Sequence, residues 1–284
     1  MTKPLVLQTD FGLCDGAVAA MNGVAISVDP ALRIFNLTHE IPPYHIWEAS
    51  YRLYQTISYW PADTVFVSVV DPGVGSDRRS IAAKTANGQY IITPDNGTLT
   101  HIKDTIVAAR EIDETANRLP HSEESYTFHG RDVYAYTGAK LAAGVIRFEE
   151  IGPEIPAGSI IELPRKAPEL QDGVITGTID TLDVRFGNLW TNIDSSLFRQ
   201  LDVNYGDSFE VTIFNESRQH YKNIMTFGHS FADSHIGEPL LYINSLYKLG
   251  IAINQGSFAK AYHIDTGIKW NITIRKAPKI VYQK

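Results

Sequence analysis

A change in the spacing of apolar residues near the middle of the chain constrains the fold more than any other feature. Residues 5–70 alternate between short apolar runs, typical of buried strands, and longer segments with helical spacing. From residue 174 onward, nearly all of the sequence consists of short alternating strand patterns. Strands that alternate with helices predict a layered, parallel sheet, whereas a series of short strands predicts a barrel or sandwich. The sequence therefore predicts an α/β N-terminal domain and an all-β C-terminal domain.

The expected boundaries follow from this change in pattern. Residues 1–161 form the predicted α/β domain, and residues 173–284 form the predicted β domain. Between them, residues 162–172 are predicted to be a linker, because they carry two prolines and little apolar periodicity.

The spacing also predicts individual elements. In the first domain we expect strands at Leu5–Gln8, Arg33–Leu37 and Thr64–Val70, helices at Ala17–Val28, Ile46–Tyr59 and Asp132–Ala143, and a hairpin of Ile81–Thr85 with Gln89–Thr93 around Asn87-Gly88. In the second domain we expect strands at Val174–Ile179, Phe209–Phe214, Leu240–Ile243, Lys248–Ile253 and Ile268–Ile274.

Composition limits the classes of function. The 284 residues carry a formal net charge of −7, which argues against nucleic acid as the main partner because phosphate binding needs a basic face. The single cysteine, Cys14, excludes an internal disulfide and a Cys-based zinc site. We expect a buried structural thiol there, with a nucleophile as the alternative. The sequence has no signal peptide pattern and no apolar segment near the roughly 20 residues of a membrane span, so the expected setting is a reducing cytoplasm.

The first polar cluster lies where the first strand is expected to end. It comprises Thr9-Asp10-Phe11-Gly12, with Asp15 close behind. Open α/β sheets bind ligands at the carboxyl ends of their strands, and a carboxylate there can accept both hydroxyls of a ribose. Asp10 is therefore a candidate ligand residue, whereas Asp15 is equally well interpreted as a ligand residue or as a helix cap. The glycine patterns of dinucleotide and triphosphate sites are absent from the sequence.

The second and third clusters place an acid, an arginine and a histidine in loops. Asp71 opens a Pro/Gly loop that can return Arg78 or Arg79 to its carboxylate, and His129 lies in a glycine-flanked loop before a helix. This Asp–Arg pair is either part of a reactive site or a structural ion pair. A metal at Asp10, Asp71 and His129 is compatible with the sequence, but nothing in the sequence requires one.

The fourth cluster, DVRFGNLWTN at 183–192, places an acid, an aromatic ring and amides in one compact run. Asp183, Phe186 and Asn188 suit the binding of an ammonium group and a purine edge. Segments 243–245 and 253–257 supply candidate backbone groups for the same ligand, although turns and strand ends have this composition too.

Taken in order, the clusters resemble the S-adenosyl-L-methionine hydroxide adenosyltransferases, a family related to the fluorinases and chlorinases. The matching segments, which span nearly the whole chain, are TDFGLCDGAVAAMNGV, VVDPGVGSDRR, TPDNGTL, TFHGRDVYA, FGNLWTNI, and YINS with INQGS. The resemblance implies a Rossmann-like N-terminal domain and a C-terminal β-barrel. It also implies hydrolysis of S-adenosyl-L-methionine at ribose C5′, giving adenosine and L-methionine, with neither cofactor nor metal. The family assembles as a homotrimer whose active sites lie between the N-terminal domain of one subunit and the C-terminal domain of the next.

The resemblance also implies roles for individual residues. Asp71, Arg78 and His129 match the set that holds and activates the attacking water. Asp10 matches the carboxylate that binds the ribose diol, Asp15 lies in a neighbouring binding loop, and Tyr44 falls at the aromatic wall of the sugar pocket. The β domain supplies the other substrate contacts: Asp183 for the methionine ammonium, Asn188 for the purine, aided by neighbouring Phe186 and by backbone around Asn254 and Gln255, and Ser245 near the methionine carboxylate.

Departures from the halogenating relatives bear on the nucleophile. Where those relatives carry Tyr-Pro and a serine, this chain has Asp71-Pro72 and His129-Gly130. An anionic Asp71 repels fluoride or chloride, which favours water. Leu246 stands where the fluorinase type has an arginine, so one contact to the methionine carboxylate is left open.

Two alternatives stand beside hydrolysis. One is a non-catalytic sensor of adenosine or S-adenosyl-L-methionine, and the other is a halide-using relative of the chlorinase type. A sensor needs Asp10, Asp183 and Asn188 but has no need of the acid, arginine and histidine set, which this chain contains in full.

Overall fold

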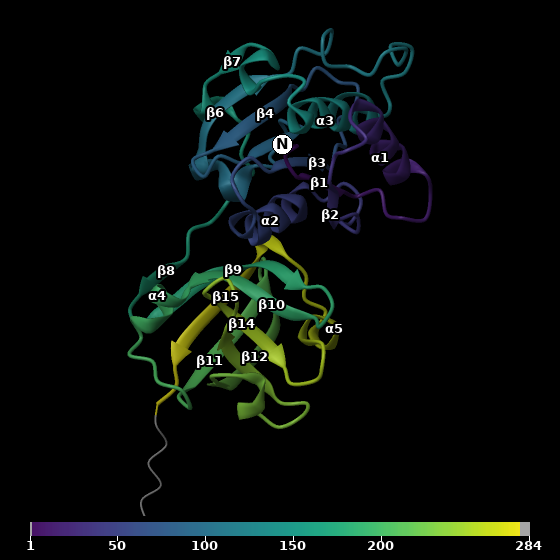
Figure 1. Ribbon diagram of the computed structural model, residues 1–284. Helices are drawn as coiled ribbons and strands as arrows, with labels where there is room; N and C mark the ends of the chain where they lie inside the picture. The colour runs from purple at the N-terminus through teal and green to yellow at the C-terminus, as the bar shows by residue number, and fades with distance from the viewer. Residues whose placement is uncertain (1, 279–284) are drawn as a thin grey trace, which may run out of the picture. The chain divides into compact units, whose positions relative to one another are not determined.

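A computed structural model describes residues 2–278 of the chain (Figure 1). The chain divides into two compact units, Met1–Leu163 and Pro164–Lys284, each with a buried apolar core of its own. The last part of the predicted β domain, residues 279–284, lies outside the described residues. Within the predicted linker, Glu169–Gln171 forms a short strand, β8, because it hydrogen-bonds along the neighbouring strand β9 (Val174–Asp183).

The N-terminal unit is built on a seven-stranded sheet with the order β2-β1-β3-β5-β4-β6-β7. Its strands are β1 (Leu5–Thr9), β2 (Ile34–Thr38), β3 (Val65–Val69), β4 (Ser80–Thr85), β5 (Tyr90–Pro94), β6 (Ile106–Glu111) and β7 (Glu154–Ile155). The first three and β5 run parallel, and β4, β6 and β7 are antiparallel to their neighbours. The predicted α/β class is confirmed. The hairpin of β4 and β5 is also confirmed, with Gly88 at φ +83, a conformation that glycine adopts without steric cost.

Helices cover both faces of this sheet, as Figure 1 shows. They are α1 (Ala17–Val28), α2 (Ile46–Thr56) and α3 (Tyr136–Ala143), with short 3₁₀ turns at Ile57–Tyr59, Thr100–Thr105, Phe148–Glu150 and Ala157–Ser159. Met21 of α1 and Ala139 of α3 share one apolar core with Leu5 of β1, whereas Leu53 of α2 packs in another core with Val6. Successive residues of a strand point to opposite faces, so the sheet lies between two helical layers.

The helix expected from Asp132 begins differently. A π-helical turn, Gly130–Ala135, precedes α3 and carries the chain away from His129. Such turns are frequent at functional sites because they shift side chains relative to a regular helix.

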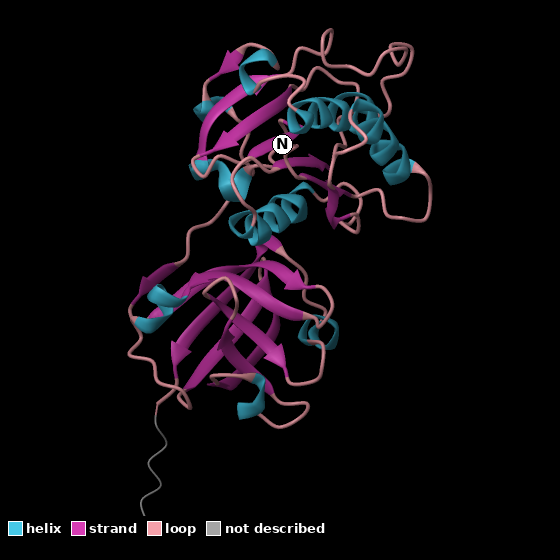
Figure 2. Cartoon of the chain, viewed as in Figure 1, coloured by secondary structure: helices cyan, strands magenta, loops and turns pink. Residues whose placement is uncertain are grey.

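The C-terminal unit is a closed barrel, whose strands are magenta in Figure 2. Its strands are β9, β10 (Asn188–Asp194), β11 (Ser208–Asn215), β12 (Arg218–Phe227), β13 (Pro239–Ile243), β14 (Lys248–Ile253) and β15 (Gly267–Lys276), with short helices α4 (Ser195–Arg199) and α5 (Phe258–Tyr262) and a 3₁₀ turn at Phe231–Asp233. The order β10-β14-β13-β12-β11-β15-β9 is closed by pairing of β9 with β10. This barrel confirms the predicted β domain.

Two further expectations concern the burial of Cys14 and membrane-spanning segments. Cys14 is exposed on the loop between β1 and α1, so the expected burial of its thiol is wrong. The reason is that residues 13–16 of this loop all lie on the surface and none packs into the core. No helix in the described part of the chain is long and apolar enough to cross a bilayer.

Candidate active site

A cavity of about 230 Å³ lies at the carboxyl ends of β1 and β3, and we call it the N-terminal cavity. Asp10 follows β1 directly and Asp71 follows β3 by two residues. The two strands are parallel neighbours, so their carboxyl ends meet at one edge of the sheet. Tyr44 and His129 also line the cavity. The fold thus brings together four of the residues singled out in the sequence.

Asp10 is fixed by the loop that carries Tyr44. Its Oδ2 accepts a hydrogen bond from the Tyr44 backbone N–H at 2.8 Å. Tyr44 has φ +68 and is 73% exposed, so its ring extends from a backbone turn rather than from a packed helix. A carboxylate has about four acceptor positions. Asp10 therefore keeps capacity to bind hydroxyl groups of a ligand.

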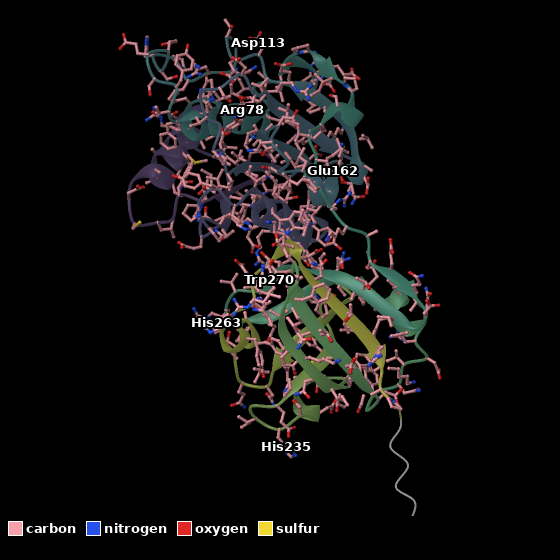
Figure 3. All side chains as sticks on the ribbon, turned by 180° about the vertical axis from the view of Figure 1, so that it is seen from behind. Arg78, Asp113, Glu162, His235, His263 and Trp270 are labelled. Carbon is pink, nitrogen blue, oxygen red and sulfur yellow. The ribbon has the colours of Figure 1, made fainter. Side chains whose placement is uncertain are left out.

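Asp71 is held by Arg78 through two parallel hydrogen bonds. Arg78 Nε donates to Oδ1 at 2.7 Å and Nη2 donates to Oδ2. The two side chains are only 5% and 11% exposed, so little water screens the pair. Figure 3 labels Arg78 among the side chains of the N-terminal unit. The structure also settles which arginine returns to Asp71, because Arg79 instead binds the fully buried Asp95 through Nε at 3.0 Å.

His129 stands next to this pair. Its Nδ1 lies 3.3 Å from Arg78 Nη2, and its Nε2 lies 3.1 Å from Nη2 of a second arginine, Arg118. Burial is the main cause that lowers the pKa of His129 from its ordinary value. The guanidinium groups of Arg78 and Arg118 lower this pKa further, against the opposing effect of nearby carboxylates. These effects together favour the neutral form of the ring.

Gly130 allows the cavity wall to close behind His129. A Cβ atom at Gly130 would lie 3.0 Å from Cε2 of Phe11, which is closer than side chains normally pack. Phe11 in turn meets Phe128 edge-to-face, with ring centroids 5.7 Å apart. The apolar wall beside His129 thus depends on glycine at this position.

Arg118 and its partner Glu114 were not predicted as site residues. Arg118 Nη2 donates to Glu114 Oε2 at 3.1 Å, and Ser80 Oγ donates to Glu114 Oε1 at 2.8 Å. An acid and an arginine four residues apart usually form an exposed helical pair, so this spacing does not suggest a site. Here the segment is a turn, and Arg118 is only 7% exposed.

A second pocket, of about 640 Å³, lies in the C-terminal unit, and we call it the C-terminal pocket. It includes five of the predicted residues: Asp183, Phe186, Asn188, Asn254 and Gln255. Asp183 ends β9 and Asn188 begins β10, where the two residues pair across the hairpin. Asn188 Nδ2 donates to Asp183 Oδ2 at 3.4 Å, and Phe186 is 65% exposed at the tip of the turn. An acid, an amide and an open aromatic face therefore border one pocket.

The backbone and the side chain of Asn254 both form hydrogen bonds within the C-terminal unit. Its backbone N–H donates to Glu238, its carbonyl accepts from Gly237 at 2.8 Å, and its side chain donates to Ser234. Gln255 follows at φ +57, so the chain turns sharply there. The backbone around Asn254 consequently serves the pocket as a fixed wall.

Three predicted residues line neither the cavity nor the pocket. Arg78 holds the cavity residue Asp71 without belonging to the lining itself. Asp15 Oδ1 accepts from the Ala17 N–H at 2.9 Å at the start of α1, which matches the helix-cap interpretation of its sequence position. Ser245 is exposed on the connection between β13 and β14. Leu246 lies on the same connection and is half-buried. Within residues 2–278 no group of three or more His, Cys, Asp and Glu side chains is placed to hold a metal ion.

An α/β unit has a cavity with charged residues at its strand ends, and the barrel has a pocket bordered by an acid, amides and aromatic rings. These features define a two-domain enzyme for a small molecule. Comparisons with known proteins narrow this class. The N-terminal domain of the SAM hydroxide adenosyltransferases matches residues 5–152, and the C-terminal domain of the same family matches residues 177–271. The chain belongs to this family.

Individual relatives agree with this assignment. The (R)-S-adenosyl-L-methionine hydrolase of Salinispora tropica is 32% identical over 273 residues, which cover 96% of this chain and 98% of the relative. A fluorinase of an Actinoplanes species is 27% identical over 303 residues, covering 96% and 97%. The crystal structure of an uncharacterized conserved protein from Thermotoga maritima superposes with a TM-score of 0.86 at 31% identity, covering 96% of this chain and all of that one.

Proposed function

We propose that this protein hydrolyses S-adenosyl-L-methionine at ribose C5′ and releases adenosine and L-methionine. The observation that carries the proposal is the nearly buried Asp71–Arg78 pair with His129 at the wall of the N-terminal cavity. A sensor would need only the binding residues, whereas these three groups form a fixed, charged assembly beside a space that a small molecule can enter. Family membership supplies the substrate class.

The reaction joins a water oxygen to C5′ as the bond from C5′ to sulfur breaks. The electron pair of that bond goes to sulfur, which leaves as the neutral thioether of methionine, and the water proton is lost. The sulfonium is a good leaving group, so the weak nucleophile is the main obstacle. A site with little water reduces solvation of the sulfonium and of the attacking oxygen. As the proton leaves, the negative charge that develops on this oxygen and the positive charge of the sulfonium cancel while the bond forms.

Asp71 is suited to orient the water and take its proton. Arg78 occupies one acceptor position on each carboxylate oxygen, and the remaining lone pairs can accept from a water molecule. Assistance by a positioned base is worth about 10²–10⁴-fold in rate. The same negative charge disfavours halide ions, which fits the higher identity to the Salinispora hydrolase than to the Actinoplanes fluorinase.

The proposed binding roles divide between the cavity and the pocket. Asp10 accepts the ribose hydroxyls, Tyr44 covers the sugar, and Asp15 shapes the adjoining loop. In the C-terminal unit, Asp183 receives the methionine ammonium and Asn188 reads the purine edge beside Phe186, Asn254 and Gln255. Ser245 contacts the methionine carboxylate.

Assembly and setting complete the proposal. We propose a homotrimer in which the N-terminal cavity of one subunit is completed by the C-terminal pocket of the next. The reaction as written needs no cofactor and no metal, because the substrate carries its own leaving group. We place the protein in the reducing cytoplasm, since its one cysteine leaves no internal disulfide to maintain. Light scattering coupled to size-exclusion chromatography tests the trimer directly.

Incubation with S-adenosyl-L-methionine in ¹⁸O-water, with and without chloride, tests the reaction. We expect the label in the 5′-hydroxyl of adenosine, and the same yield in both samples. Binding without cleavage would refute the proposal in favour of a sensor. A chlorinated nucleoside in the chloride sample would refute the selectivity for water.

A further inference from the structure

His129 meets a guanidinium group at each ring nitrogen. Arg78 Nη2 lies 3.3 Å from Nδ1, and Arg118 Nη2 lies 3.1 Å from Nε2. A guanidinium has only donors, whereas a neutral imidazole has one acceptor nitrogen and one N–H. Only one of the two arginines can therefore donate to this ring, and the other must face the ring N–H.

Arg118 is the better placed donor. Its contact with the ring is the shorter one, at 3.1 Å against 3.3 Å, and its Nη2 has a second hydrogen for the ring besides the one that it donates to Glu114. Arg118 is 7% exposed, and its guanidinium carbon lies 4.7 Å from the centre of the Tyr126 ring. These contacts hold the guanidinium group beside the ring, so no rearrangement of an exposed side chain is needed for the contact.

Glu114 anchors Arg118 and links it to the other arginine. Glu114 accepts from Arg118 at 3.1 Å and from Ser80 Oγ at 2.8 Å. Ser80 Oγ in turn accepts from Arg78 Nη1 at 3.1 Å. The hydrogen bonds thus run from His129 through Arg118, Glu114 and Ser80 to Arg78, whose Nη2 lies beside the other ring nitrogen. A connected chain of this kind restricts the arrangement of its members.

We propose that Arg118, anchored by Glu114, is a positioning residue that donates to Nε2 of His129 and leaves the ring proton on Nδ1. That nitrogen faces the pair of Arg78 and Asp71 at the cavity wall. His129 then serves as a hydrogen-bond donor at the position of the attacking oxygen, and removal of the proton falls to Asp71. The catalytic meaning of this inference rests on the proposed hydrolysis, whereas the position of the ring proton does not.

The ring tautomer is measured without any substrate. Solid-state ¹⁵N spectra of the ¹⁵N-histidine-labelled protein distinguish a protonated from an unprotonated ring nitrogen, and comparison with His129→Gln assigns the signals. We expect protonation at Nδ1 in the wild type and a mixture of tautomers in Arg118→Met. Protonation at Nε2 in the wild type would overturn the inference. The wild-type spectrum alone shows which ring nitrogen is protonated, so this test does not depend on whether an Arg118 variant folds.

The pH dependence of turnover gives an independent test. His129 is faced by the charged groups Asp71, Arg78, Glu114 and Arg118, with the Tyr126 ring edge-on at 6.0 Å. Arg118 lowers and Glu114 raises the pKa of His129. In Arg118→Met the acid limb of kcat/KM should therefore move to higher pH, and in Glu114→Gln to lower pH.

The changes in kcat and KM distinguish a positioning role of Arg118 from a purely structural one. Loss of a group that orients a catalytic residue costs about 10- to 100-fold, so kcat of Arg118→Met should fall by that amount with a smaller change in KM. Arg118→Lys keeps the charge and should recover part of kcat. Parallel shifts of the acid limb in Arg118→Met and Glu114→Gln would overturn the inference. A wild type that forms no adenosine would refute the proposed function instead and leave the tautomer result standing.

Discussion

Replacing Asp71 by asparagine isolates the charge of this carboxylate from its shape. The amide has nearly the same volume, and its oxygen can still accept from Arg78 Nε, which now lies 2.7 Å from Oδ1. Its NH₂ group would face Arg78 Nη2, so one of the two parallel hydrogen bonds is lost. The variant therefore keeps the site assembled while it removes the proposed base.

The expected loss follows from the role of the base. Removing general-base assistance lowers kcat by about 10²–10⁴-fold. Each factor of ten corresponds to about 1.4 kcal/mol of activation free energy, so the barrier rises by roughly 3–6 kcal/mol. The side chain is 5% exposed, and the buried Arg78 loses an anionic partner, so the free energy of unfolding should also fall, by about 1–3 kcal/mol.

The assay is chromatographic measurement of adenosine at saturating substrate, with urea unfolding of the same samples. Asp77→Asn is the matched control, because it replaces a carboxylate by an amide on the same loop. Asp77 is exposed and does not line the N-terminal cavity. Its turnover should equal that of the wild type. If Asp71→Asn turns over within a factor of about three of the wild type while remaining folded, the assignment of Asp71 as the base is wrong.

Three further predictions concern binding, pH and backbone geometry. Asp183→Ala should raise KM about 10- to 100-fold with little change in kcat, because a hydrogen bond to a charged group is worth about 1.5–3 kcal/mol; a change confined to kcat would contradict a binding role. Burial lowers the pKa of His39 below its ordinary 6.5, so the unfolded chain binds more protons just below that pH, and stability should fall as the pH drops through this range. Urea unfolding on both sides of pH 6.5 measures the slope, which should be shallower in His39→Gln; an equal slope would exclude His39 as its source. Gly187→Ala should lower the free energy of unfolding by about 1–3 kcal/mol more than Gly206→Ala, because both glycines have positive φ but only a Cβ at Gly187 would strike Ser257, 1.9 Å from its Oγ. Equal losses in denaturant titrations would mean that backbone strain alone matters.

The local sequence was enough to predict most elements of regular structure. Ala17–Val28 is a helix with the predicted bounds, because its apolar spacing and the Asp29-Pro30 stop are both contained in the segment. The strand β12 was not predicted, since its polar residues face outward and its apolar residues are few. β12 is held in the sheet by pairing with β11, the strand directly before it, and with β13 on its other side. Its own composition does not show this pairing.

By itself, the sequence determined an α/β domain followed by an all-β domain and the loops that carry Asp71 and His129, because these depend on the order and spacing of neighbouring residues. Its motifs also indicated the family, and the resemblance to that family implied that the β domain is a barrel. The spacing left Arg78 and Arg79 as possible partners of Asp71, the resemblance implied Arg78, and the tertiary structure places Arg78 there. Only the tertiary structure brought Arg118 to the far nitrogen of His129. Arg78 and His129 are 51 residues apart in the chain. Contacts over such separations are set by the order of strands in the sheet and by the buried partners that hold each charge, and neither is encoded in local spacing.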